Sequence, residues 1–276
     1  MKLNFELKLG AVIAIFIVTI SLLSFFWTPH DYNSMDHTNR FLPPGSSGSP
    51  DAGHLFGTDN FGRDILSRVM IGGRNSLFLS VFVVAGAAAI GSLLGLLAGY
   101  LGGVTETIIM RFIDTISSFP GIVLALVFVA VMDNSQFTLF IALLILFIPS
   151  YTRVMRTGAL QYKDAAFIQA ERLLGAGYLR ITFIHILPNV APSLLSASVL
   201  GLSNAILAEA SMSYLGMGIQ PPQPSWGRML HEAQTYFSAA PWSALAPGIF
   251  IVLTVIAFHL LGEGIRRGFG GQSGSA

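Results

Sequence analysis

A polar segment interrupts the apolar sequence near the middle of the chain. It comprises Gln169, Ala170, Glu171, Arg172, Leu173, Leu174 and Gly175, and it is followed by His185, Ile186, Leu187 and Pro188. Long apolar stretches on both sides suit lipid, whereas a polar segment that ends in glycine needs a role outside the lipid. We expect this segment to contact a soluble partner protein.

A second candidate site lies in a stretch that is otherwise apolar. Glu209 is close in sequence to Ser211 and Ser213, and a charged group within a membrane span usually faces a cavity or a partner. In one interpretation these residues line a translocation path and meet a cationic or zwitterionic group, such as a peptide amino terminus or a metal chelate. In the other, Glu209 forms a hydrogen bond with a neighbouring helix.

The sequence predicts no metal ligand and no catalytic residue. His185 and His231 are too far apart in sequence to indicate a metal site, and His259 is alone in an apolar stretch, where we expect a packed, hydrogen-bonded side chain. The motifs HExxH and GxSxG and paired intramembrane aspartates do not occur. A membrane-embedded enzyme therefore stays an alternative without a supporting motif.

The composition predicts an all-α integral membrane protein. Apolar residues make up 53% of the chain, charged residues 11%, and the mean hydropathy is +0.68. A membrane-spanning helix needs about 20 mainly apolar residues. Six stretches meet this requirement: Leu9–Trp27, Ser76–Tyr100, Thr107–Val131, Gln136–Tyr151, Ala191–Tyr214 and Trp242–Leu261.

The first apolar stretch has features of both a signal peptide and a retained anchor. Lys2 and Lys8 precede it, as in a signal peptide, but Phe25, Phe26 and Trp27 occupy its far end, where a cleavage site has small residues. Aromatic residues suit the lipid headgroup region. We therefore expect residues 1–27 to form an N-terminal transmembrane anchor.

Basic residues predict the orientation. If the N-terminus is cytoplasmic, most lysines and arginines lie inside, including Arg266 and Arg267 in a cytoplasmic tail of residues 266–276. The arginines of the outer segment, residues 28–75, are accompanied by aspartates. We expect a multi-pass protein of the cell inner membrane with both termini in the cytoplasm.

The outer segment begins as irregular loop and then carries a short helix pattern. Asp59 is the expected N-cap of an amphipathic helix whose apolar face holds Phe61, Ile65, Leu66 and Val69. We expect this helix to lie on the outer membrane surface, separate from the next span.

Two spans contain special packing residues. Gly91, Gly95 and Gly99 recur every four residues and allow close approach of another helix, either in this chain or in a second subunit. Pro120, within the third stretch, removes a backbone hydrogen bond and predicts a kink, which is either static or a hinge.

The predicted cytoplasmic loop, residues 152–188, contains a short helix from Lys163 to Leu174. Asp164 is its expected N-cap and Gly175 its stop signal. An isolated helix this short is marginal in water. Because Phe167, Ala170, Leu173 and Leu174 fall on one face, we expect that face to pack on something.

The polar segment and its spacing to His185–Pro188 resemble the permease subunits of binding-protein-dependent ABC importers. The similarity is to the dipeptide, oligopeptide and nickel branch, in its DppC/OppC/NikC-like permease. Three further blocks carry the resemblance, and together they span most of the chain in order: residues 56–64, 215–218 and 221–227.

The resemblance implies the type I importer permease fold, with residues 76–265 as its transmembrane core. It implies half of a translocation pore for di- or oligopeptides, nickel or metal chelates, completed by a second homologous permease. Two ABC ATPase subunits, an extracytoplasmic substrate-binding protein and the lipid bilayer are the implied partners; nucleic acid is not. The residues implied for coupling to an ATPase are Gln169, Ala170, Glu171, Arg172, Gly175 and Pro188. The first five belong to the coupling helix and its end, and Pro188 would fix the turn into the fifth span.

The sequence departs from the family at one position. The family motif begins Glu-Ala-Ala, whereas this chain has Gln169-Ala170-Glu171. The carboxylate is therefore displaced by about 200° around the helix axis, and Glu171 is not a simple substitute for a glutamate at 169.

The chain lacks the means to hydrolyse ATP itself. A P-loop requires Gly-Lys-Ser/Thr, and none of the lysines, Lys2, Lys8 and Lys163, follows a glycine. We expect this chain to bind no cofactor, with ATP and Mg used by partner subunits. A secondary transporter or channel is the alternative, although the internal repeats common in such carriers are not visible.

Overall fold

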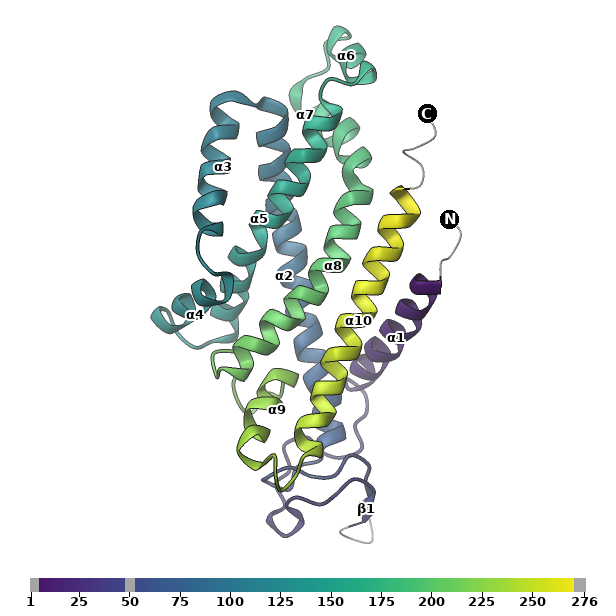
Figure 1. Cartoon of the computed structure of the whole chain (residues 1–276), viewed down its shortest axis with the longest axis vertical. Helices are drawn as coiled ribbons and strands as arrows, with labels where there is room; N and C mark the ends of the chain where they lie inside the picture. Colours follow the sequence, from purple (N-terminus) through teal and green to yellow (C-terminus); the bar gives the residue numbers. More distant parts are fainter. Residues whose placement is uncertain (1–4, 48–52, 271–276) are drawn as a thin grey trace.

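Long apolar runs become helices because lipid offers no hydrogen-bond partner for the backbone. A computed structural model describes residues 5–47 and 53–270, which form an elongated bundle of helices (Figure 1). The longer helices are α1 Phe5–Leu23, α2 Ile65–Leu101, α3 Gly103–Ser117, α4 Gly121–Val131, α5 Gln136–Tyr162, α8 Leu187–Tyr214 and α10 Trp242–Gly270. The short elements are η1 His37–Asn39, β1 Ser46–Ser47, β2 Gly53–His54, α6 Ala166–Leu173, α7 Tyr178–Arg180, the π-helix η2 Ile181–Ile186, α9 Trp226–Ala233 and η3 Gln234–Tyr236.

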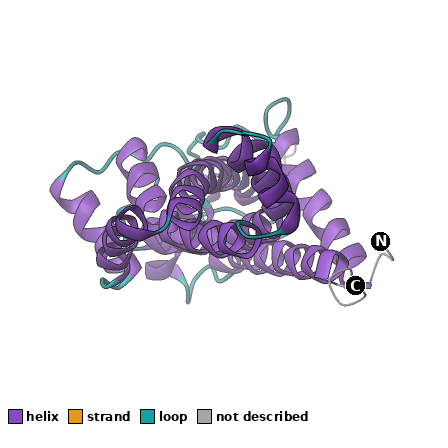
Figure 2. Ribbon diagram, turned by 90° about the horizontal axis from the view of Figure 1, so that it is seen from above, coloured by secondary structure: helices purple, strands orange, loops and turns teal. Residues whose placement is uncertain are grey.

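Five helices of the described chain are long and apolar enough to cross a membrane, and a sixth span results if α3 and α4 count as one. α2 packs mainly on α5 and α8, while α10 packs on α8 and α1. Seen along the long axis, these helices stand side by side in an elongated cross-section (Figure 2). The small antiparallel pair β1–β2 lies at the opposite end of the bundle from α6 (Figure 1).

The start of the second span differs from the prediction. Among residues 53–64 of the described chain no separate amphipathic helix precedes it, and α2 runs without a break from Ile65. Its N-cap is Asp64, whose Oδ2 accepts a hydrogen bond from the Ser67 amide at 2.8 Å. Asp59, the predicted cap, instead accepts from Arg63 Nε at 2.6 Å. The prediction was wrong because the apolar face packs on distant protein segments rather than on lipid.

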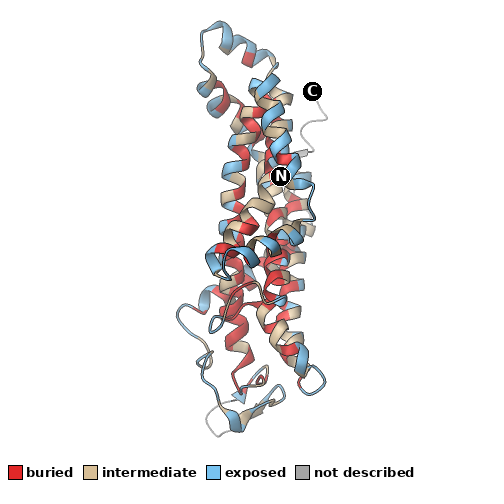
Figure 3. Ribbon diagram, turned by 90° about the vertical axis from the view of Figure 1, so that its left-hand side faces the viewer, coloured by how far each residue is buried: buried red, intermediate tan, exposed pale blue. Residues whose placement is uncertain are grey.

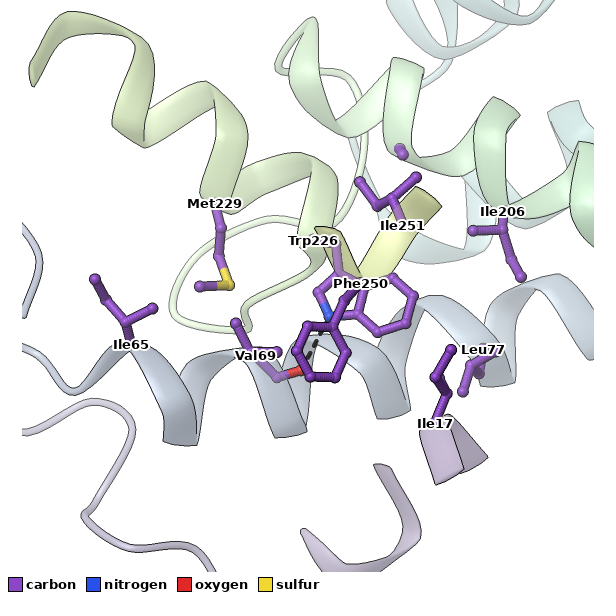
Figure 4. Close-up of a cluster of buried hydrophobic side chains, with 10 residues drawn as sticks. Ile17, Ile65, Val69, Leu77, Ile206, Trp226, Met229, Phe250 and Ile251 are labelled. Carbon is purple, nitrogen blue, oxygen red and sulfur yellow. Dashed lines mark hydrogen bonds between the residues drawn. The ribbon is translucent and has the colours of Figure 1, made fainter. Parts of the chain in front are cut away.

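Trp226 provides much of that packing. Its side chain is fully buried beside Val69 of α2 and Phe250 of α10, and Ile65 of α2 belongs to the same buried cluster (Figure 4). The indole Nε1 donates a hydrogen bond to the Val69 carbonyl at 3.0 Å. This contact places α9, the first turns of α2 and the first half of α10 against one another, and it extends the buried part of α2 beyond the predicted span.

The third predicted span is broken rather than gently kinked. α3 ends at Ser117, α4 begins at Gly121, and their axes differ by 83°. Pro120 occupies the N-cap position of α4, where its missing amide hydrogen costs nothing. The predicted effect of Pro120 is present, but as a break between two helices.

The fourth and fifth spans also extend beyond their predicted limits. α5 continues to Tyr162, past Pro149 inside the helix. Helical backbone is continuous from Tyr178 to Tyr214 through η2, so Pro188 does not mark a turn into the fifth span as expected. The chain turns earlier, between α6 and α7.

At the C-terminus α10 includes residues 266–270 of the predicted tail, and residues 271–276 lie outside the described chain.

The glycine stripe of α2 packs against α5 within this chain. A Cβ atom added at Gly91 would lie 2.6 Å from Tyr151 Cβ, and one added at Gly99 would lie 2.6 Å from Ala159 Cβ. At Gly95 the added atom would lie 2.7 Å from Met155 Cβ. These separations are too short for real side chains, so glycine permits the close contact of α2 with α5.

Candidate coupling surface and buried polar site

The helix α6 projects beyond one end of the bundle (Figure 1). It ends in a Schellman motif, in which the Gly175 amide donates to the Arg172 carbonyl at 3.0 Å and the Ala176 amide donates to the Glu171 carbonyl at 3.0 Å. Gly175 has a φ of +80°, a conformation that side chains with a Cβ disfavour. The glycine predicted as a stop signal therefore ends the helix.

One buried side chain attaches α6 to the bundle. Ile168 is fully buried among Leu96 of α2, Met155 of α5 and Ile181 of η2. Arg172 adds a second contact, since its guanidinium lies over the ring of Tyr100 near the end of α2. Helix α6 is therefore anchored through one face, as its short length requires.

The opposite face of α6 is uncovered within this chain. Leu173 is 90% exposed, Leu174 at the C-cap of α6 is 81% exposed, and Leu179 in α7 is 66% exposed. In Figure 3 this end of the molecule is mostly coloured as exposed, unlike the middle of the bundle. Ala170 and Pro188 are exposed as well. Large apolar side chains grouped in this way indicate a surface for another protein.

The polar residues of α6 form contacts with neighbouring parts of this chain. Asp164 is not the N-cap, because Ala165 occupies that position and caps with no side-chain hydrogen bond. Instead Gln169 Nε2 donates to the Asp164 carbonyl at 3.0 Å. The carboxylate of Glu171 lies 3.6 Å from His185 Nε2. The displaced carboxylate of this chain thus pairs with η2, a contact that the sequence did not predict.

The side chain of Glu209 is fully buried within this chain. Its Oε1 accepts a hydrogen bond from Ser213 Oγ at 2.6 Å, and Ser213 Oγ accepts from the Ile219 amide at 3.1 Å. Ser211 Oγ donates to the Leu207 carbonyl of its own helix at 2.7 Å. This hydrogen bond of Glu209 stays within α8 and does not reach a neighbouring helix, as one of the two interpretations expected, and Ser213 connects Glu209 to the segment that follows α8.

A cluster of ion pairs at the β1–β2 end escaped the sequence reasoning. Arg63 Nη2 lies 2.7 Å and Arg68 Nη2 2.9 Å from Glu232 Oε2 in α9, while Arg228 Nε lies 3.2 Å from Glu232 Oε1. Burial raises the pKa of Glu232, but Arg68, Arg63 and Arg228 outweigh this and hold the pKa below its ordinary value. Arg63 and Arg68 are far from Glu232 in sequence, so no local pattern reveals these two pairs, whereas Arg228 is four residues from Glu232 in α9.

The comparisons with known proteins agree with this arrangement. Residues 91–270 match the family of binding-protein-dependent transport system inner membrane components. The dipeptide transport system permease protein DppC of Haemophilus influenzae is 38% identical over 265 residues, which cover 96% of this chain and 90% of that protein. The glutathione transport system permease protein GsiD of Pectobacterium atrosepticum is 39% identical over 256 residues, which cover 93% of this chain and 85% of that protein.

A solved structure shows the same fold. A chain of the MetNI methionine ABC transporter, in an inward facing conformation, matches with a TM-score of 0.60 at 18% identity, covering 73% of this chain and 95% of that chain. The family match extends over more than half of this chain and the relatives cover nearly all of it. The chain therefore belongs to the binding-protein-dependent transport system inner membrane components, the permease subunits of ABC importers.

Proposed function

We propose that this chain forms one half of the translocation pore of an ATP-driven importer of small peptides. A second, related permease would supply the other half. Two ATP-hydrolysing subunits, which use ATP and Mg, would bind at the α6 end, and a substrate-binding protein would deliver the peptide at the β1–β2 end. The observation that carries the proposal is the exposed apolar face of α6, anchored on its other side by Ile168.

The substrate class follows from the relatives. The two relatives described above are named for dipeptide and glutathione transport, and both substrates are short peptides. Nickel and metal chelates are the alternative substrates implied by the resemblance of the polar segment. The test measures uptake of a labelled dipeptide in the presence of competitors. Uptake that falls with excess glutathione, and does not fall with excess Ni²⁺, would support the peptide assignment. Competition by Ni²⁺ alone would favour the alternative.

The proposed orientation places α6 in the cytoplasm with both termini. Lys163, Arg172 and Arg180 belong to this end of the molecule, and basic residues prefer the cytoplasmic side. In Figure 1, α1 begins and α10 ends on the side toward α6.

The chain has no cysteine, so single cysteines at Met35 and Gln161, which are both exposed, test the orientation. An impermeant thiol reagent should label Met35→Cys in intact cells and spare Gln161→Cys. The reverse labelling contradicts the orientation.

Purification from native membranes tests the assembly. A tagged copy of this chain should bring with it one related permease and two copies of ATPase subunits, as measured by the intact mass of the detergent-solubilised complex. ATP enclosed in reconstituted vesicles should drive transport that an ionophore leaves unchanged. A chain that transports alone, and stops when the ion gradient is removed, would instead be a secondary carrier.

A further inference from the structure

Two histidines and one carboxylate from three separate segments meet at the β1–β2 end of the molecule. His30 lies in the loop after α1, His54 in β2, and Asp64 at the N-cap of α2. The rings of His30 and His54 have centroids 4.6 Å apart, and His54 Nδ1 is 2.9 Å from Asp64 Oδ1. Each residue offers one ligand atom, and these three atoms all lie within 4.8 Å of one another.

Ser67 holds this arrangement in place from the first turn of α2. Its hydroxyl donates to Asp64 Oδ2 at 2.7 Å and accepts from the His30 amide at 3.0 Å. The Ser67 amide also donates to Asp64 Oδ2, at 2.8 Å. These bonds engage one carboxylate oxygen and leave Oδ1 directed toward His54. The backbone of His30 and the carboxylate of Asp64 are therefore both positioned by the same side chain.

The cluster borders an open cavity of about 160 Å³. Asp31, Ser34, Asp36, Asn39 and Gly62 line the remainder of the cavity. Asp64 and His54 are buried and His30 is half-buried, so the cavity gives water and ions access to the cluster. The surrounding carboxylates favour a cation there, and the cavity has room for water as an additional ligand.

We propose that His30, His54 and Asp64 bind one Zn²⁺ ion. Zinc takes imidazole nitrogen and carboxylate oxygen at about 2.0–2.2 Å in a four-coordinate arrangement, which small side-chain rotations achieve from the separations present. Water in the cavity supplies the fourth ligand. Two imidazoles favour a borderline transition metal over Mg²⁺ or Ca²⁺, which take oxygen ligands. The proposal does not depend on the transported substrate.

The bound ion would connect the loop after α1, the β1–β2 pair and the start of α2. The His54–Asp64 and His30–Ser67 hydrogen bonds already link these segments at the cluster, and the ion would add bonds to all three of the side chains that it joins. An ion that binds only the folded arrangement stabilises it in proportion to its occupancy. The alternative is a plain hydrogen bond between His54 and Asp64, which predicts no metal affinity.

The test uses the full chain without a polyhistidine tag, purified in detergent and treated with a chelator. Titration with Zn²⁺ against a chromophoric chelator should give one equivalent of tight binding, with Ni²⁺ weaker and Mg²⁺ undetectable. Three variants should each weaken Zn²⁺ binding by about tenfold or more: His30→Ala, His54→Ala and Asp64→Asn. Asn is as good an N-cap as Asp, so Asp64→Asn keeps the cap of α2 and tests the ligand separately from the fold.

His37→Ala is the matched control, because His37 is an exposed histidine of the same outer segment and does not line the cavity. It should bind Zn²⁺ as the unaltered chain does. Zn²⁺ should also raise the melting temperature of the unaltered chain and of His37→Ala, but not of Asp64→Asn. The proposal is overturned if the unaltered chain binds no Zn²⁺, or if folded Asp64→Asn and His30→Ala bind it with unchanged affinity.

Discussion

The guanidinium of Arg172 lies over the ring of Tyr100, with Cζ 5.1 Å from the ring centroid, and its Nε donates to the Tyr100 hydroxyl at 3.3 Å. The Arg172 Nη2 also donates to the Lys163 carbonyl at 3.1 Å. Tyr100 in turn packs on Tyr178, with ring centroids 5.2 Å apart. One arginine thus joins α6 to the last turn of α2 and, through Tyr100, to the start of the fifth span. Movement of α6 would reach the membrane helices through this contact.

Arg172→Ala should weaken the link between α6 and α2. A cation over an aromatic ring contributes about 0.5–1 kcal/mol at an exposed site, so peptide transport per ATP hydrolysed should fall roughly two- to fivefold. The measurement is uptake and ATP hydrolysis in the same reconstituted vesicles. Arg180→Ala, at an exposed arginine without polar contacts in the described chain, is the control. An unchanged ratio in Arg172→Ala contradicts the role of the contact.

Gly95→Ala should destabilise the bundle, because the added methyl group would meet Met155 of α5. Overpacking of this kind costs about 1–3 kcal/mol, which exceeds the gain of about 1 kcal/mol from replacing glycine by alanine in a helix. The melting temperature in detergent should fall. In Gly248→Ala, where the nearest atom is 4.0 Å from the added Cβ, it should stay equal or rise. Equal stabilities of the two variants are inconsistent with close α2–α5 contact.

Glu232 should make the outer ion cluster sensitive to acid. In the folded chain the pKa of Glu232 lies below its ordinary value of 4.5. The contribution of its charge to the free energy of unfolding is therefore complete above pH 4.5, and it decreases as the pH falls through the lower pKa of the folded state. Glu232→Gln should therefore lower the melting temperature at pH 7, and the difference from the unaltered chain should shrink as the pH falls below 4.5. A difference that is constant with pH would show that the charge of Glu232 is not responsible.

Glu209→Gln should leave transport largely intact. Glutamine retains an oxygen that accepts the hydrogen bond from Ser213, whereas Glu209→Leu leaves Ser213 and the segment after α8 without that acceptor. We expect the leucine variant to be destabilised by about 1–3 kcal/mol and the glutamine variant much less. Uptake of a labelled dipeptide is the second readout. A well-assembled Glu209→Gln complex that no longer transports would restore the interpretation that this carboxylate meets the substrate.

The sequence predicts the features that depend on local pattern. The helices α1 and α10 were predicted correctly from their apolar runs, because lipid requires such runs. The end of α6 was predicted correctly from Gly175, because a positive φ favours glycine. The N-cap of α2 was wrong because Asp59 and Asp64 are equally suitable by type, and the choice depends on Arg63 and Trp226. The pairing of Glu171 with His185 escaped prediction for the same reason, since it depends on how two helices cross.

The most direct test of the account concerns the exposed leucine of α6. Leu173 is 90% exposed within this chain, and a charge there should remove an apolar contact with an ATPase subunit, a type of loss that costs about 2 kcal/mol or more at the centre of an interface. Leu55→Asp is the control, because Leu55 is 62% exposed in the outer segment. The measurement is the amount of ATPase subunit that co-purifies with each variant from native membranes. The account predicts a loss of about tenfold or more for Leu173→Asp and none for Leu55→Asp, at equal amounts of the chain in the membrane. Full recovery of the ATPase subunits with Leu173→Asp would contradict it.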